Sequence, residues 1–154
     1  MSTIENRLAT LGLQLPEPPR PAGNYRATII VGGLLFISGQ MPVLNGELKY
    51  RGRVGAELTE EQAGAAARLC ALNVLSQINA ALSGFDRLVS LLHVQGHVSS
   101  TPQWLNQPRV IDYASDLLID VLGEKGHHTR SAFAPANLPL NVPIELVVTA
   151  AVSG

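Results

Sequence analysis

The sequence predicts a single α+β domain in which two helices cover one face of a β-sheet. Its 154 residues fit one hydrophobic core, because two domains of half that length would each bury too little surface. Segments with a two-residue apolar alternation are interleaved with two segments of helical periodicity. The predicted order is two or three strands, a helix, a strand, a helix and two strands, which is most economically arranged with both helices on the same face. The other face then needs a cover, and a partner subunit is the natural candidate.

A β-hairpin is expected at the start of the domain. Tyr25 to Val31 and Leu34 to Ser38 are mainly β-branched and apolar, and Gly32-Gly33 separates them. Two glycines can both adopt a positive φ, which the tight turns of hairpins require. Asn45-Gly46 predicts another tight turn, which opens a short third strand or loop.

Two helices are predicted from their end signals and apolar stripes. The first should begin at Thr59, because Gln62 completes a capping-box pattern, and Ser83-Gly84 should end it. Its stripe consists mainly of small residues, so we expect this helix close against the sheet: Ala67, Ala71, Val74, Ile78 and Ala81. The second helix should begin near Pro108, a favoured first-turn residue, and end at Gly123.

A long strand is expected over residues 88–98, between the two helices. Simple alternation places Leu88, Ser90, Leu92, Val94, Gly96 and Val98 on one face and Val89, Leu91, His93, Gln95 and His97 on the other. The second face becomes polar towards its end, as expected of a sheet that faces a wet interface or cleft. The last two strands are expected near residues 128–133 and 144–152, and three prolines keep their connection irregular.

The first 22 residues are expected to form a short helix and a proline-rich strap laid over the domain. Ile4, Leu8 and Leu11 would share one face of the helix, and the prolines of 16–21 hold that segment extended. We therefore divide the chain into this N-terminal part, 1–22, and one α+β domain, 23–154.

Composition favours an oligomer and argues against nucleic acid or a membrane as partner. Hydrophobic residues make up 46% and charged residues 15% of the chain, which is an apolar composition for so small a protein. A subunit interface would bury the excess apolar surface. The formal net charge is −1 and no run of Lys or Arg is present, so the basic footprint of a nucleic-acid partner is missing. The N-terminus resembles neither a signal peptide nor an anchor, and no apolar stretch approaches the roughly 20 residues that span a bilayer. We expect a cytoplasmic protein.

A metal site is not expected. Cys70 is the only cysteine, so it can form neither an intramolecular disulfide nor a thiolate cluster, and its helical context favours a buried small apolar residue. His127 and His128 are adjacent and would point to opposite faces of a strand. His93 and His97 share a face but would lie about 13 Å apart at the rise of a strand.

Four local motifs carry the chemistry of the sequence. They are Gly23-Asn24-Tyr25 before the first strand, Ser38-Gly39-Gln40-Met41-Pro42 at the end of the second, Arg130-Ser131 in the fifth, and residues 138–145 leading into the sixth. Tyr25 and Ser38 are 13 positions apart, and Arg130 and Glu145 are 15 positions apart. In order and spacing, the chain from Gly23 to Val152 resembles the Rid (YjgF-type) family of imine and enamine deaminases, also labelled endoribonuclease L-PSP. The additional 22 residues indicate a longer, divergent branch.

The resemblance implies a homotrimer with a chorismate-mutase-like fold and clefts between neighbouring subunits. Typical members hydrolyse reactive 2-imino acids to the 2-oxo acid and ammonia, and they need no metal or organic cofactor. It also implies site roles. Arg130 and Glu145 would be catalytic. The substrate, a small carboxylate-bearing metabolite, would be bound by Arg130, by Tyr25, and by backbone groups of Gly39 and Ala132.

Elementary chemistry agrees with these roles. A guanidinium binds a carboxylate bidentately, through charge-assisted hydrogen bonds worth roughly 1.5–3 kcal/mol. A carboxylate such as Glu145 can position and polarise the attacking water as a general base. The alternatives are an exposed strand arginine at position 130, a strand-edge carboxylate at 145 that pairs with a surface cation, and a core tyrosine at 25 with a satisfied hydroxyl.

Two residues depart from the family pattern, and they keep other functions open. Ala132 stands where typical members often carry a cysteine, and Asp112 stands where an asparagine is common. A negative charge at 112 would oppose carboxylate binding, so Asp112 either points away or indicates a different ligand; His128 is a further candidate to line the pocket. The alternative function is a trimeric module that binds or scavenges small carboxylates without efficient catalysis. A nuclease would need a basic patch, and the sequence shows none. A chorismate-mutase-like isomerase would need several cationic groups to hold a dicarboxylate, and Arg130 has no evident second cation beside it.

Overall fold

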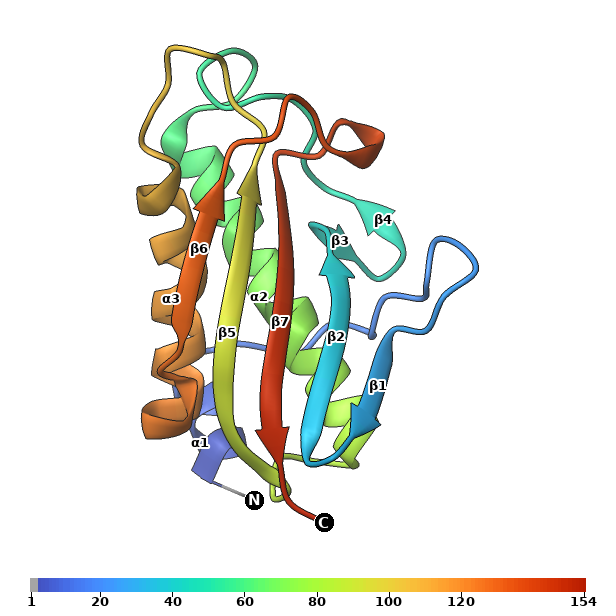
Figure 1. Ribbon diagram of the computed structural model, residues 1–154. Helices are drawn as coiled ribbons and strands as arrows, with labels where there is room; N and C mark the ends of the chain where they lie inside the picture. Colours follow the sequence, from blue (N-terminus) through green and yellow to red (C-terminus); the bar gives the residue numbers. More distant parts are fainter. Residues whose placement is uncertain (1–2) are drawn as a thin grey trace.

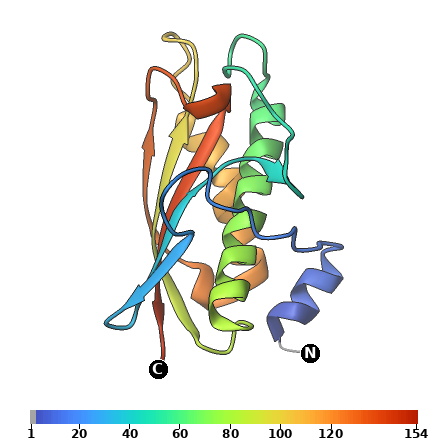
Figure 2. The same cartoon turned by 90° about the vertical axis from the view of Figure 1, so that its right-hand side faces the viewer.

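The computed structural model describes residues 3–154, which form one five-stranded sheet with two long helices packed on one of its faces (Figures 1 and 2). The helices are α1 (Thr3–Thr10), α2 (Glu60–Leu82) and α3 (Gln107–Leu122), with the 3-10 turns η1 (Gly123–Gly126) and η2 (Pro139–Asn141). The strands are β1 (Thr28–Val31), β2 (Leu34–Gln40), β3 (Val43–Leu44), β4 (Glu47–Leu48), β5 (Leu88–Val98), β6 (Thr129–Phe133) and β7 (Ile144–Val152). The predicted α+β class and the two helices on one face are confirmed.

The sheet has the order β1-β2-β7-β5-β6, with β3 and β4 in a separate hairpin. All neighbouring strands are antiparallel except β5 and β6, which are parallel because α3 carries the chain back between them. Strand β6 is therefore an edge, and β7 lies at the centre between β2 and β5.

The predicted end signals set the observed element boundaries. Thr59 caps α2 with a complete capping box to Gln62, and Ser83 ends the helix in the left-handed region with a φ of 55°. Gly32 and Gly33 turn the β1–β2 hairpin with φ values of 55° and 77°. A non-glycine residue is strained at such angles, so this glycine pair determines where the hairpin turns.

The predicted faces of β5 are wrong in its first half. Leu91 is buried and Leu92 is exposed, the reverse of simple alternation. The register against β7 shifts between Leu88 and Ser90 and again between Leu91 and His93. Each bulge inserts one residue, so the alternation changes phase twice and only the second half follows the predicted pattern.

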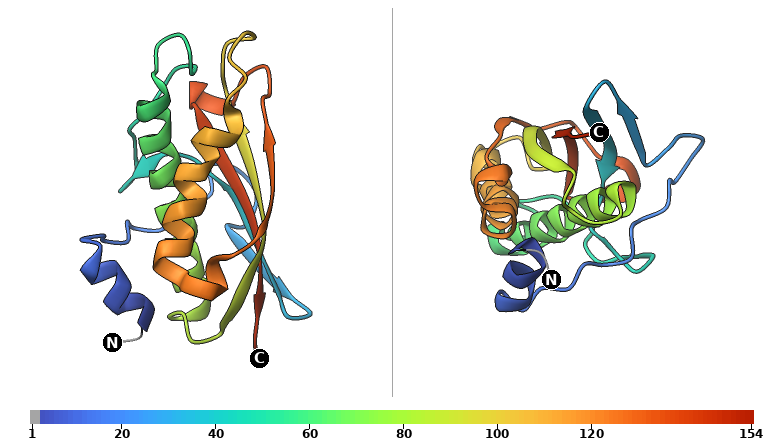
Figure 3. Two further views of the ribbon diagram at one scale, coloured as in Figure 1. Left: turned by 90° about the vertical axis from the view of Figure 1, so that its left-hand side faces the viewer. Right: turned by 90° about the horizontal axis from the view of Figure 1, so that it is seen from below.

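Helix α1 lies on the outer side of the helix layer, away from the sheet (Figures 2 and 3). Helix α1 packs against α3 and buries Ile4 and Leu8. The proline-rich strap then crosses α2 and leads into β1 (Figure 3). None of the described helices is long and apolar enough to cross a membrane.

The sheet face opposite α2 and α3, which we call the open face, is not covered by any helix or loop of residues 3–154 (Figure 3). Ile29 and Phe36 are paired across β1 and β2 on this face, and they are 51% and 45% exposed. Apolar side chains in such a position are typical of a subunit interface.

Candidate functional site

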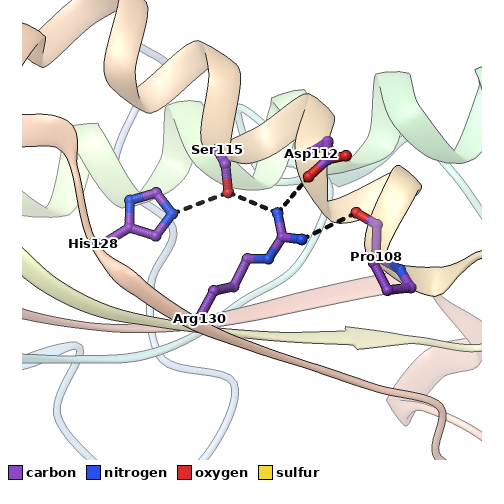
Figure 4. A network of polar contacts seen from close by, with 5 residues as sticks. All are labelled: Pro108, Asp112, Ser115, His128 and Arg130. Carbon is purple, nitrogen blue, oxygen red and sulfur yellow. Dashed lines mark hydrogen bonds and ion pairs between the residues drawn. The ribbon is translucent and has the colours of Figure 1, made fainter.

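Arg130 lies on the edge strand β6, and its side chain extends across to α3 (Figure 4). Nη1 donates to Asp112 Oδ1 at 2.7 Å and to Ser115 Oγ at 3.2 Å, and Nη2 donates to the carbonyl of Pro108 at 3.4 Å. The three acceptors are four and three residues apart in sequence, so they lie on one face of α3. The helix thus holds the guanidinium in one orientation.

Two N–H groups of Arg130 stay available for a ligand. A guanidinium has five donors, and α3 uses three of them. The remaining two are Nε–H and one Nη2–H, and Nε and Nη2 form one edge of the planar group. That edge matches the two oxygens of a carboxylate. The side chain of Arg130 is 24% exposed, so it is not sealed off from solvent.

His128 fixes the hydroxyl that supports Arg130. Its Nδ1 lies 2.6 Å from the carbonyl of Gly126, which can only accept, so Nδ1 carries the proton. In this tautomer Nε2 accepts from the hydroxyl of Ser115 at 3.0 Å, and the same oxygen accepts from Arg130. Burial lowers the pKa of His128, which favours the neutral ring that this arrangement requires.

Glu145 lies near the start of β7, in register with His97 of β5. Its carboxylate is half-buried, and burial raises its pKa. No Lys or Arg within residues 3–154 pairs with it, so it is not the cation-paired surface carboxylate of the alternative reading. Gly39 of β2 lies directly against it: a Cβ there would overlap Oε1 and lie 2.9 Å from Cδ. Any side chain at position 39 would therefore clash with Glu145 in its observed position.

Tyr25 and Gly39 line a pocket of about 370 Å³ beneath the strap. Tyr25 is 49% exposed, and its hydroxyl accepts from the backbone N–H of Ala22 at 3.0 Å. Tyr25 is therefore a surface residue of a pocket wall and not a core tyrosine. Ala132 of β6 pairs with Gly96 of β5 and packs partly against the core on the helix side.

The predicted residues form two groups on opposite faces of the sheet. Arg130 pairs with Val94, which is fully buried beneath the helices, whereas Glu145 pairs with His97 on the open face. Residues paired across strands share a face, and Val94 and His97 are an odd number of residues apart. Within one chain, Glu145 lies with Gly39 and near Tyr25, and Arg130 and Ala132 lie apart from them.

Sequence reasoning missed the α3 side of the site. Asp112 does not point away but contacts Arg130, and the roles of Ser115 and the Pro108 carbonyl were not anticipated. The spacing of these residues on one helical face was the available signal. Of the adjacent histidines, His128 faces α3 and His127 is exposed. No group of three or more potential metal ligands occurs in the described part of the chain.

Comparisons with known proteins identify the family. Residues 5–151 match the family described as "YjgF/chorismate_mutase-like, putative endoribonuclease". The chain is 39% identical over 144 residues to Protein TCP17 of Trypanosoma cruzi, covering 93% of this chain and 90% of that one. The solved structure of Atu1372 of Agrobacterium tumefaciens, a protein of unknown function, is 39% identical with a TM-score of 0.91, over 98% of this chain and 93% of that one.

A solved structure from Shewanella oneidensis, which carries the same endoribonuclease label, is 36% identical with a TM-score of 0.94. The match covers 98% of this chain and 100% of that one. The N-terminal helix and strap are therefore included in a fold that these relatives share. With the match over almost the whole chain and the motifs of the two site groups in place, the protein belongs to the YjgF/chorismate-mutase-like family that its sequence resembles.

Proposed function

We propose that this protein is a hydrolase that converts small, reactive 2-imino or enamine acids to 2-oxo acids and ammonia without a cofactor. Water adds to the carbon of the C=N bond, and the C–N bond then breaks as the C=O bond forms and ammonia leaves. The protein must supply a cation for the substrate carboxylate and a base for the attacking water.

The position of Glu145 is the observation that carries the proposal. Its carboxylate is half-buried, pairs with no Lys or Arg in the described chain and lies directly against Gly39, which has no side chain to cover it. A general base works best when its pKa is close to the pH of the reaction, and burial moves the pKa of Glu145 in that direction.

The opposite orientations of Arg130 and Glu145 support a site shared between subunits. The free edge of the Arg130 guanidinium on β6 would bind the substrate carboxylate at the Glu145 site of a neighbouring chain. A homotrimer, which the family resemblance implies, would supply such contacts in a closed ring. The apolar open face supports the same assembly, because it needs a cover.

Ala132 favours a second candidate, a binding or scavenging module for small carboxylates, because it replaces a cysteine that typical family members often carry. Asp112 lies 2.7 Å from Arg130 and offsets part of the positive charge that either candidate would use to bind a carboxylate. Such a protein would bind 2-oxo acids without accelerating the hydrolysis of imines.

A trapping assay separates the two candidates. Amino-acid oxidases generate the imines in situ, and semicarbazide traps what the protein has not hydrolysed. Wild type should lower the semicarbazone yield, and Arg130→Ala and Glu145→Gln should each reduce kcat/KM on the order of 10²-fold. Arg87→Ala is the matched control, because this arginine binds the carbonyl of Ser153 at the other end of the sheet. If wild type does not accelerate the hydrolysis of these imines, the hydrolase proposal is refuted.

Mixed oligomers test whether the site is shared. Arg130→Ala and Glu145→Gln are co-expressed and isolated as mixed assemblies. In a mixed trimer, whichever variant is in excess, about a third of the interfaces combine an intact Arg130 from one subunit with an intact Glu145 from the next. Activity should therefore return to about a third of wild type. No recovery in verified mixed oligomers, or a monomer by sedimentation at micromolar concentration, contradicts the shared site.

A further inference from the structure

The pocket beside Gly39 is built largely by the N-terminal strap. Strap residues 17–22 form one wall, and Gly39 to Met41 and the β3–β4 hairpin form the other. Its volume of about 370 Å³ is in the range of small-molecule sites, roughly 300–1,000 Å³. A segment that a shorter version of the domain would lack therefore creates a cavity at the candidate site.

A buried polar row on α2 holds both walls in place. Ser76 Oγ donates to the carbonyl of Pro16 and Gln77 Nε2 to that of Pro19, each at 2.8 Å. Asn73 Nδ2 donates to the carbonyls of Met41 and Val43 at 3.0 and 2.8 Å. All three side chains of the row are at most 3% exposed. Buried hydrogen bonds of this kind are costly to break, so the pocket is preformed.

The pocket shares one boundary with Glu145. Gly39 lines the cavity and also lies against the carboxylate of Glu145, so a substrate attacked near Glu145 would extend into the cavity past Gly39. The lining is mainly apolar and includes Pro19, Ala27, Met41 and Leu48. Its two charged residues, Glu17 and Arg20, are both exposed, so they lie where water can solvate them. An uncharged, apolar group fits this environment, and a second carboxylate does not.

We infer that the strap pocket binds the side chain of the substrate, and that the protein prefers 2-imino acids with branched aliphatic or aromatic side chains over small or acidic ones. This inference rests on the proposed hydrolase function. An apolar pocket discriminates by roughly 10- to 200-fold per methylene group that it encloses. The imine of leucine should accordingly be hydrolysed with a kcat/KM at least tenfold higher than the imine of alanine.

A substrate series tests the preference. Imines of alanine, leucine, phenylalanine and glutamate are generated by amino-acid oxidases and compared in the trapping assay. Ala22→Trp, on the strap wall, should fill the cavity and reduce the ratio of leucine to alanine rates at least tenfold. Ala56→Trp is the matched control, an exposed loop alanine outside the pocket lining, and should leave the ratio unchanged.

Binding measurements keep the two proposals separate. Calorimetry with 4-methyl-2-oxopentanoate, 2-oxopropanoate and 2-oxopentanedioate reports the same side-chain preference without catalysis. Hydrolysis of all four imines at similar rates overturns the pocket inference and leaves the hydrolase standing. If no imine is hydrolysed but the branched 2-oxo acid binds at least tenfold more tightly, the hydrolase fails and the pocket assignment stands. Equal binding of the three 2-oxo acids, or an unchanged rate ratio in folded Ala22→Trp, also overturns the pocket inference.

Discussion

Substitution of Gly39 by alanine should damage catalysis far more than folding. The new Cβ would overlap Oε1 of Glu145 and lie 2.9 and 3.1 Å from Cδ and Cγ. The carboxylate is the flexible end of its side chain and can turn away, so we expect a loss of about 1 kcal/mol in the free energy of unfolding. The turn displaces the proposed base by about 1 Å, and a displacement of that size costs on the order of 10²-fold in rate. We therefore expect kcat/KM in the trapping assay to fall about 100-fold.

A double-mutant cycle isolates the cause of this effect. If the clash with Glu145 destabilises Gly39→Ala, the same substitution in a Glu145→Ala background should cost almost nothing in urea unfolding. The reasoning is refuted if Gly39→Ala keeps wild-type activity. An equal loss of stability in both backgrounds would also refute it, because the strain would then come from the backbone of β2.

Three further predictions concern the charged groups. Asp112→Asn removes the carboxylate that competes for Arg130 and should strengthen 2-oxo acid binding about two- to fivefold by calorimetry; weaker binding would mean that Asp112 aids recognition. Because burial raises the pKa of Glu145, the base form appears only as the pH rises through that raised value. In a pH profile, the kcat/KM of wild type should thus fall on the acidic side at a pH above the ordinary Glu pKa of about 4.3. A fall that occurs at the ordinary Glu pKa would exclude Glu145 as the base. Burial lowers the pKa of His128, so the unfolded chain binds more protons between the two values, and wild type should lose stability as the pH falls through about 6.5. Urea unfolding at pH 7.5 and 5.5 should show a smaller loss for His128→Gln, and an identical loss would exclude His128 as the cause.

The elements of the fold could be predicted because their signals are local. Residues close together in the sequence encode the Thr59 capping box, the Gly32-Gly33 turn and the strand over residues 144–152. Each of these lies where the sequence predicts it. The phase of β5 could not be predicted, because its two bulges depend on pairing with β7, more than fifty residues away in the chain.

The sequence motifs propose residues for the candidate site but do not predict how the fold arranges them. Family motifs point to Arg130 and Glu145, but sheet order and register place their side chains on opposite faces. The bonds of Arg130 to α3 depend on how a helix packs against an edge strand, which no local pattern encodes. The strap pocket likewise depends on Ser76 and Gln77, whose partners lie some sixty residues earlier.

The edge position of β6 has a consequence for how this family can diversify. An edge strand leaves a row of backbone N–H and C=O groups unpaired within its own chain. Ligand contacts made by such groups survive any substitution that preserves the strand, so alanine can replace cysteine at position 132 without removing the main-chain part of the proposed site. Contacts made by the side chains of Arg130 and Glu145 have no such tolerance. Substitutions on β6 at positions other than Arg130 should therefore change which substrates are accepted before they abolish binding.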